Sequence, residues 1–126
     1  MMNSDFCAEI IGHIDSDIRQ IELRDGVGCS FRIQTLRTYT DEWGVLHNKP
    51  MWIPVITFDT TMTAKITRDF PRGSFVQIIS RELRWNEPRQ AKNGKYYNNV
   101  DFVIDAIESA RNEVPADAGV IAGVTV

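Results

Sequence analysis

Lys49-Pro-Met-Trp-Ile-Pro-Val-Ile-Thr-Phe-Asp59 is the stretch of sequence that decides the fold. Its β-branched and aromatic residues, with turn-forming residues on both sides, predict a strand rather than a helix. Side chains alternate between the two faces of a strand, which puts Trp52 and Phe58 on the same face. Both faces are too apolar for either one simply to lie in water. The Trp52 face is therefore either a second buried layer or a surface that receives a flat ligand.

Length and composition are those of one soluble globular domain. The chain has 126 residues, of which 43% are hydrophobic and 25% are charged, enough for a core without a metal or disulfide. A net charge of −3 and a pI near 5.3 argue against a uniformly basic surface for nucleic acid. A polyanionic partner would have to meet a local patch, and Arg81 to Lys95 supplies one, with five cations against two anions.

Several classes of protein are disfavoured by what the sequence lacks. Cys7 and Cys29 have no metal-ligand spacing and are expected to be small buried thiols in a reducing compartment. No secretory signal and no apolar stretch of about 20 residues is visible, so we expect a cytoplasmic protein. Asp59, Asp101 and Asp105 do not form a two-metal nuclease pattern, because Asp59 is expected to cap a helix. We expect a non-enzyme without metal or cofactor.

The remainder of the chain predicts further strands and one helix. The helix is expected over residues 60–70, because Asp59 or Thr60 can cap it, apolar residues recur every fourth position, and Pro71 stops it. Gly12 indicates a sharp bend or a close backbone approach, as at a barrel corner. The expected strands cover residues 6–23 with a polar break at 15–17, then 29–39, 51–58, 75–85 and 96–107.

Five strands with one helix between the third and fourth, and long hairpins after the second and fourth, have the element order of the OB-fold. An up-and-down sandwich is the alternative, but it gives no reason for a lone capped helix in the middle of the chain. We therefore expect an all-β protein with one helix, folded as a five-stranded Greek-key OB barrel. The expected domain spans residues 1–109, and residues 110–126 form a short flexible tail, in which 120–124 could add an edge strand.

An ordered set of motifs resembles the bacterial and phage single-stranded DNA-binding protein family. The motifs are Ala8–Arg19, Phe31–Thr35, Trp52–Phe58, Arg72–Val76, Leu83–Trp85 and the pair Tyr96-Tyr97, and they cover most of residues 8–107. Tyr39 falls where that family usually carries a stacking tryptophan. The resemblance implies a protein that coats single-stranded DNA during replication, recombination or repair. It also implies a homo-oligomer, with a homotetramer favoured over a dimer.

The sequence departs from that family in two informative ways. Pro54 stands where a basic residue is common, so one expected phosphate contact is missing. The bacterial members end in an acidic tail with a terminal Pro-Phe, whereas this sequence ends in Gly-Val-Thr-Val. Recruitment of replication enzymes through such a tail is therefore in doubt. A phage, plasmid or mobile-element version is favoured over a host's main protein.

Binding an unpaired strand without reading its sequence requires aromatic platforms for the bases and spaced cations for the phosphates. Trp52 and Phe58 lie about 20 Å apart by strand rise, so they would contact different nucleotides. The expected nucleic-acid-binding residues are Arg37, Tyr39, Trp52, Phe58, Arg84, Trp85, Arg89, Lys92, Lys95 and Tyr96.

These assignments have structural alternatives. Trp52 could be a core or subunit-interface residue, and Phe58 could close the barrel against Met62. Tyr39 has the parity of core-facing residues, so it reaches a groove only if its strand bends or extends beyond the barrel. Nothing decides whether Trp43 anchors its loop or offers another platform. For the whole protein, the alternatives are an OB-fold protein-interaction module, primosome-like or a phage accessory, and an RNA-binding OB protein.

Overall fold

The computed structural model describes residues 4–90, 92–94 and 96–110, with side chains described outside 86–90 and 96–99. Residues 111–126 of the expected tail lie outside this range, so the domain boundary at residue 109 stays a prediction. Within the described residues, no helix is long and apolar enough to cross a membrane. In chain order the elements are β1 (Ala8–Ile14), β2 (Arg19–Leu23), β3 (Gly26–Thr40), β4 (Leu46–Thr57), α1 (Thr60–Asp69), β5 (Phe75–Gln90) and β6 (Tyr96–Ser109).

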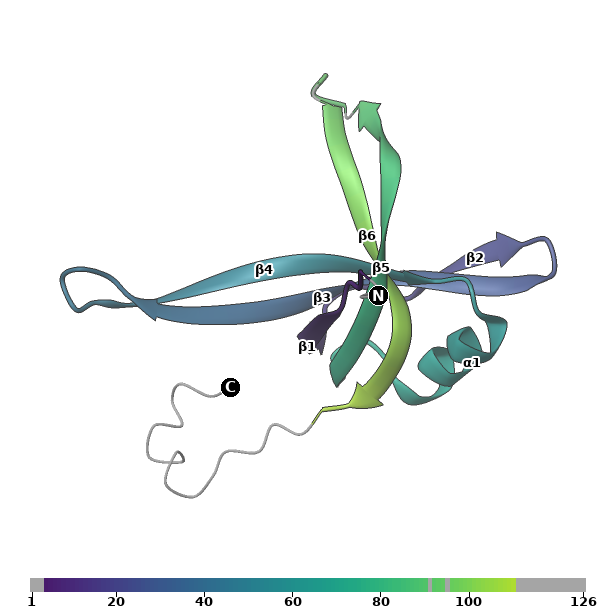
Figure 1. The fold of residues 1–126 in the computed structure, drawn as a ribbon, viewed down its shortest axis with the longest axis horizontal. Helices are drawn as coiled ribbons and strands as arrows, with labels where there is room; N and C mark the ends of the chain where they lie inside the picture. The colour runs from purple at the N-terminus through teal and green to yellow at the C-terminus, as the bar shows by residue number, and fades with distance from the viewer. Residues whose placement is uncertain (1–3, 91, 95, 111–126) are drawn as a thin grey trace.

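The strands form a closed barrel, which confirms the predicted OB-fold. Their order is β1-β5-β6-β4-β3-β2, and a further pairing of β1 with β3 closes the ring. All neighbours are antiparallel except β4 and β6, which run parallel. β1 and β2 are the two parts of the expected first strand, separated at the polar break. With these counted as one, α1 lies between the third and fourth barrel strands, at one side of the barrel (Figure 1).

Gly12 allows β1 to pair with two neighbouring strands. Residues Ala8 to His13 pair with β5, and His13 and Ile14 also pair with Gln34 and Ile33 of β3. A Cβ atom at Gly12 would collide with the backbone carbonyl of Gln34 and lie 2.9 Å from a methyl group of Ile33. The predicted close approach is confirmed, because only a residue without a side chain lets β3 cross here.

The core is built from the inward face of each strand and one stripe of α1. Fully buried side chains include Ile33, Val55, Ile78 and Ile107, with Ile66 from the helix. Because inward and outward side chains alternate, these residues fix which face of each strand points away from the barrel.

The helix has the predicted start. The Asp59 side chain accepts hydrogen bonds from the backbone N–H groups of Thr61 at 2.8 Å and Met62 at 3.2 Å, as an N-cap should. The helix ends at Asp69 with Phe70 as its C-cap, one residue before the predicted end.

Of the two expected buried thiols, only Cys29 is buried, and burial raises the pKa of its thiol. The prediction was wrong for Cys7, which is exposed because it precedes the first strand.

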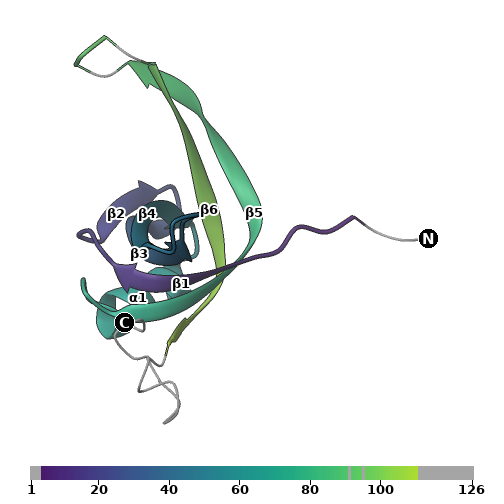
Figure 2. The same ribbon diagram turned by 90° about the vertical axis from the view of Figure 1, so that its left-hand side faces the viewer.

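Two hairpins are longer than predicted and project from the barrel in different directions. The β3–β4 ladder continues from the barrel to the pair Thr40 and Leu46, and the β5–β6 ladder continues to Gln90 and Tyr96. Figure 1 shows the β3–β4 arm to the left and the β5–β6 arm upward, and Figure 2 shows the β5–β6 arm arching away from the barrel. Most of the residues expected as the loops 41–48 and 86–94 are therefore ends of strands and a tight turn.

Candidate nucleic-acid interface

The outer face of β4 carries two of the predicted aromatic side chains. Ile53 and Val55 face the core, so Trp52, at the next position along the strand, points away from it. The exposed fractions are 47% for Trp52 and 40% for Phe58, while Ile56 between them is only 6% exposed. This face is therefore neither a sealed second layer nor wholly open. It presents two aromatic surfaces separated by a buried aliphatic residue.

Trp52 is held by the connection between β1 and β2. Its indole Nε1 donates a hydrogen bond to Oδ2 of Asp15 at 2.6 Å. Asp15 is itself fixed, because its backbone N–H donates to the carbonyl of Arg32 at 2.9 Å. The backbone N–H of Arg32 in turn donates to Oγ of Ser16 at 2.9 Å. The indole ring therefore has a defined orientation on the surface, which suits a stacking platform.

Phe58 lies beside a cation from another strand. Cζ of Arg84 is 4.8 Å from the centroid of the Phe58 ring, a cation–π contact that at an exposed site is worth about 0.5–1 kcal/mol. Phe58 therefore lies at the surface and not inside the barrel. Arg84 is paired in register with Asp101 of β6. The structure thus brings together two predicted residues, the cation Arg84 of β5 and the aromatic Phe58, which directly follows β4.

A pocket of about 310 Å³ lies on the same outer face, between the positions of Trp52 and Phe58 along β4. Pro54 lines it, together with the cations Arg19 and Arg32 and the carboxylates of Asp17 and Asp101. Arg32 is the register partner of Pro54. A cation therefore lies beside Pro54, on the neighbouring strand.

Sequence reasoning did not select Arg19 or Arg32. A signal for Arg32 existed, since it alternates with the core residues Phe31 and Ile33 and so must face outward. Its place beside Pro54 depends on cross-strand register, which the local sequence does not encode. Arg19 ends the Ala8–Arg19 motif, but that motif assigns no role to its side chain.

Tyr39 and Arg37 lie on the other face of the β3–β4 arm. Arg37 pairs with Lys49, and the three side chains Arg37, Tyr39 and Lys49 line a cavity of about 280 Å³. The parity of these residues is that of the core-facing positions, as noted from the sequence, and they reach solvent because the strand continues beyond the barrel. By register, Trp52 and Tyr39 are on opposite faces of one two-stranded ribbon.

Trp85 is similarly placed on the second arm. Trp85 lies two residues after Leu83, and the register partner of Leu83, Phe102, packs against the core. Trp85 is therefore on the same side of the ribbon as the core-facing residues, whereas Arg84 is on the outer side. Its side chain is 72% exposed because the arm has left the barrel. The structure therefore groups Trp52, Phe58 and Arg84 on the barrel and puts Tyr39 and Trp85 on the arms.

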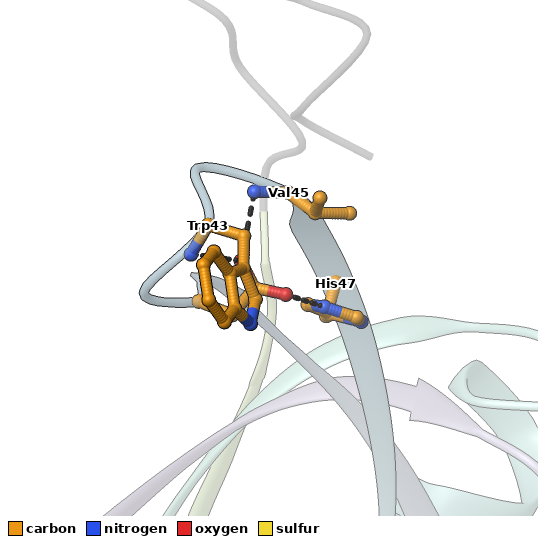
Figure 3. A network of polar contacts seen from close by, with 4 residues as sticks. Trp43, Val45 and His47 are labelled. Atoms are coloured by element: carbon orange, nitrogen blue, oxygen red, sulfur yellow. Dashed lines mark hydrogen bonds and ion pairs between the residues drawn. The ribbon is translucent and has the colours of Figure 1, made fainter.

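The tip of the β3–β4 arm has its own network of polar contacts, shown in Figure 3. Asp41 accepts hydrogen bonds from the backbone N–H groups of Trp43 and Val45, each at 2.9 Å, and its Oδ2 lies 2.6 Å from Nε2 of His47. These contacts, the one with His47 above all and the one with Val45 next, lower the pKa of the Asp41 carboxyl. The His47 ring stacks on Tyr39, with centroids 5.2 Å apart and planes at 19°.

The remaining predicted residues are only partly described. Lys92 is exposed in the turn between β5 and β6. Arg89 and Tyr96 lie in the paired ends of these strands, but their side chains are outside the described set, and Lys95 lies outside the described residues. Among the residues that the structure does describe, no group of three or more His, Cys, Asp or Glu side chains is arranged to hold a metal ion.

Comparison with known proteins gives no match by sequence and clear matches by structure. No family model matches the chain, and no curated protein does. A small single-stranded DNA-binding protein from Streptomyces coelicolor has a TM-score of 0.67 at 16% identity, covering 86% of this chain and 96% of that one. A Plasmodium falciparum SSB, solved in complex with ssDNA, has a TM-score of 0.70 at 15% identity, covering 86% and 95%. At these identities the likeness establishes a shared fold.

Proposed function

We propose that this protein binds single-stranded DNA with little sequence preference and belongs with the single-stranded DNA-binding proteins whose fold it shares. The observation that carries the proposal is the pair of exposed rings, Trp52 and Phe58, on one outer face with Arg84 and Arg32 beside them. A structural neighbour solved with ssDNA supports it. The expected roles are protection of the strand in DNA replication, recombination or repair in the cytoplasm of a bacterial cell, by a phage or mobile-element protein that is not an enzyme.

Exposed aromatic side chains are the first line of support. Tyr39, Trp43, Trp52, Phe58 and Trp85 are all at least 40% exposed. Exposed large apolar groups mark interaction sites where they lie together, as Trp52 and Phe58 do on the barrel, and rings suit a partner with flat faces. Each base stacked on such a ring contributes about 1–3 kcal/mol. The hydrogen bond from Trp52 to Asp15 supports this use, because a ring held in advance loses less freedom on binding.

Local positive charge is the second line of support, because the chain as a whole is acidic. Exposed cations accompany three of these rings: Arg32 pairs with Pro54, two residues from Trp52, Arg84 lies over Phe58, and Arg37 lies beside Tyr39. A backbone of phosphates needs such spaced cations, whereas a neutral partner surface does not. This alternation of ring and cation favours a function in binding unpaired nucleic acid over the alternative function of a protein-interaction module.

We also propose that the protein works as a homo-oligomer, with a homotetramer expected. Support comes from β1, which pairs with β5 on one side and reaches β3 only at His13 and Ile14. Ile11, on this strand, is exposed. An uncovered strand edge with apolar side chains favours pairing with a second copy. Sedimentation equilibrium tests this, and a monomer at micromolar concentration would contradict it.

The direct test is a titration of the purified protein with fluorescein-labelled oligo-dT at low salt, followed by anisotropy and tryptophan fluorescence. We expect tight binding with strong quenching, and much weaker binding of a duplex of equal length. A matched oligo-U arm tests the RNA alternative, since only a contact to the 2′-hydroxyl would favour RNA. Absence of both binding and quenching would overturn the proposal and leave the protein-interaction module as the better account.

A further inference from the structure

The tip of the β3–β4 arm, residues 39–47, is held together by side-chain and backbone contacts of Asp41. Besides its contacts with Trp43, Val45 and His47, Asp41 is joined to the turn through its backbone. Its N–H donates to the carbonyl of Val45 at 3.0 Å, and its carbonyl accepts from Gly44 at 3.0 Å. Gly44 has a φ of 77°, which the tight turn requires. The tip therefore has a defined shape without any ligand.

This network controls the surroundings of two aromatic rings. Trp43 is 80% exposed, yet its backbone N–H is bonded to Asp41, so the base of the side chain is fixed while the indole lies in solvent. Tyr39 is stacked on His47, and His47 is held by Asp41 through its Nε2 atom. One face of the Tyr39 ring is thus covered by a residue that cannot easily move away (Figure 3 shows His47 bonded to the cluster).

Cations next to these rings identify the kind of ligand. Arg37 and Lys49 line the 280 Å³ cavity together with Tyr39. Two cations beside a ring that is stacked on one face suit a nucleotide, with its base against the ring and its phosphate at the cations.

We propose that Asp41 is a positioning residue that prepares the arm tip as a two-ring nucleotide site, with Tyr39 set through His47 and Trp43 set through its backbone. The inference rests on the proposed function and adds contacts to it. Asp41 does not contact the DNA. It acts by reducing the ordering that binding requires, at the Tyr39 ring through His47 and at the backbone of Trp43, which is how preorganisation increases affinity.

The direction in which affinity changes when Asp41 is replaced distinguishes a positioning role from a simple effect of its negative charge. A carboxylate near a path of phosphates repels them, so deleting one should tighten DNA binding. Glu42 provides the control, because it is adjacent, exposed, and has no hydrogen-bond partner for its carboxylate among the described residues. If Asp41 only contributes charge, Asp41→Asn and Glu42→Gln should change affinity in the same direction. If it positions the rings, they should change affinity in opposite directions.

The experiment measures oligo-dT affinity by anisotropy for wild type, Asp41→Asn, Asp41→Ala and Glu42→Gln. We expect Glu42→Gln to bind equally or more tightly and Asp41→Ala to bind about 5- to 150-fold more weakly, the effect of leaving two side chains to be ordered on binding. Asp41→Asn keeps an oxygen acceptor for the backbone N–H groups of Trp43 and Val45 but puts an NH2 group where Oδ2 contacts His47, so its affinity should be intermediate. The slope of log affinity against log salt should be unchanged in Asp41→Ala, since no phosphate contact is lost.

A double-mutant cycle measures the coupling free energy between Asp41 and Trp43, which a purely structural role of Asp41 would leave at zero. Trp43→Ala should weaken binding in the wild type and have less effect in the Asp41→Ala background, because the backbone that carries the Trp43 ring is already less ordered there. Fully additive effects, or an Asp41→Asn variant that binds as tightly as Glu42→Gln, would overturn the inference. If Asp41→Ala loses structure, the Asp41→Asn comparison decides alone. If wild type does not bind oligo-dT at all, the proposed function itself fails, which is a different outcome.

Discussion

Replacing Trp52 with alanine tests the interface at its best-defined ring. The substitution removes a stacking platform, which should cost about 1–3 kcal/mol of binding free energy, or about 5- to 150-fold in affinity at 1.4 kcal/mol per tenfold. The stability cost should be smaller than the roughly 3–5 kcal/mol of a buried aromatic truncation, because the side chain is 47% exposed. The lost hydrogen bond to Asp15 adds about 0.5–1.5 kcal/mol. The protein should therefore stay folded and bind weakly.

Two matched variants make the test specific. Met51→Ala removes a neighbouring side chain that is 53% exposed but is not aromatic and points to the other face. It should weaken binding much less than Trp52→Ala, because it removes no stacking ring. Trp52→Phe keeps a ring but loses the bond to Asp15, so its affinity should lie between wild type and alanine. Anisotropy with oligo-dT gives the affinities, and urea denaturation gives the stabilities.

Two results would refute the reasoning about Trp52. Equal weakening by Met51→Ala and Trp52→Ala would mean that general apolar surface, and not stacking, holds the strand. Unfolding of Trp52→Ala under native conditions would mean that the ring is a structural residue of the barrel.

Three further predictions follow from other parts of the structure. Arg84→Gln should flatten the slope of log affinity against log salt by about 0.7, and the paired change Lys92→Gln with Lys95→Gln by about 1.4, if each cation meets one phosphate; an unchanged slope would mean that the cation faces away from the strand. NMR titration of the Asp41 carboxyl should give a pKa below 3.8, rising toward 3.8 in His47→Ala. Because this pKa is lowered by folding, its contribution to stability is present above about pH 4 and is lost as pH falls through the native pKa; a carboxyl that titrates at its ordinary value would contradict the hydrogen-bond network. Gly12→Ala should destabilise the protein by about 1–3 kcal/mol in urea denaturation, because the added Cβ would collide with the carbonyl of Gln34. A Gly12→Ala variant as stable as the wild type would show that β3 can shift without cost.

The parts of the fold that local chemistry determines could be predicted from the sequence. The N-cap at Asp59 and the close approach at Gly12 are both recognisable from a few neighbouring residues. The length of the arms was not predicted. Beyond the barrel, pairs such as Thr38 and Asn48 continue the ladder with polar side chains. Since neither face is buried there, the alternating hydrophobic pattern that marks a strand disappears.

The sequence identifies the exposed rings of the candidate site, but only some of the residues that hold them in place. Aromatic side chains and clustered cations are visible as residue types, but Asp15 and Asp41 are carboxylates, which an anionic ligand would disfavour. Asp15 acts on Trp52, which is 37 residues away in sequence, so its role appears only when the chain is folded. The outward position of Arg32 could be inferred from alternation, but its place opposite Pro54 required the register.

The independence of the two arms from the core has a consequence for how such a protein can diverge. Since side chains repeat every two residues along a strand, either arm can gain or lose residues in pairs, in steps of about 7 Å, and keep Tyr39 or Trp85 on its present face. A single inserted residue would instead turn the ring to the reverse side. Reach along a bound polymer can thus be adjusted in discrete increments while the barrel, whose side chains lie elsewhere, keeps its stability.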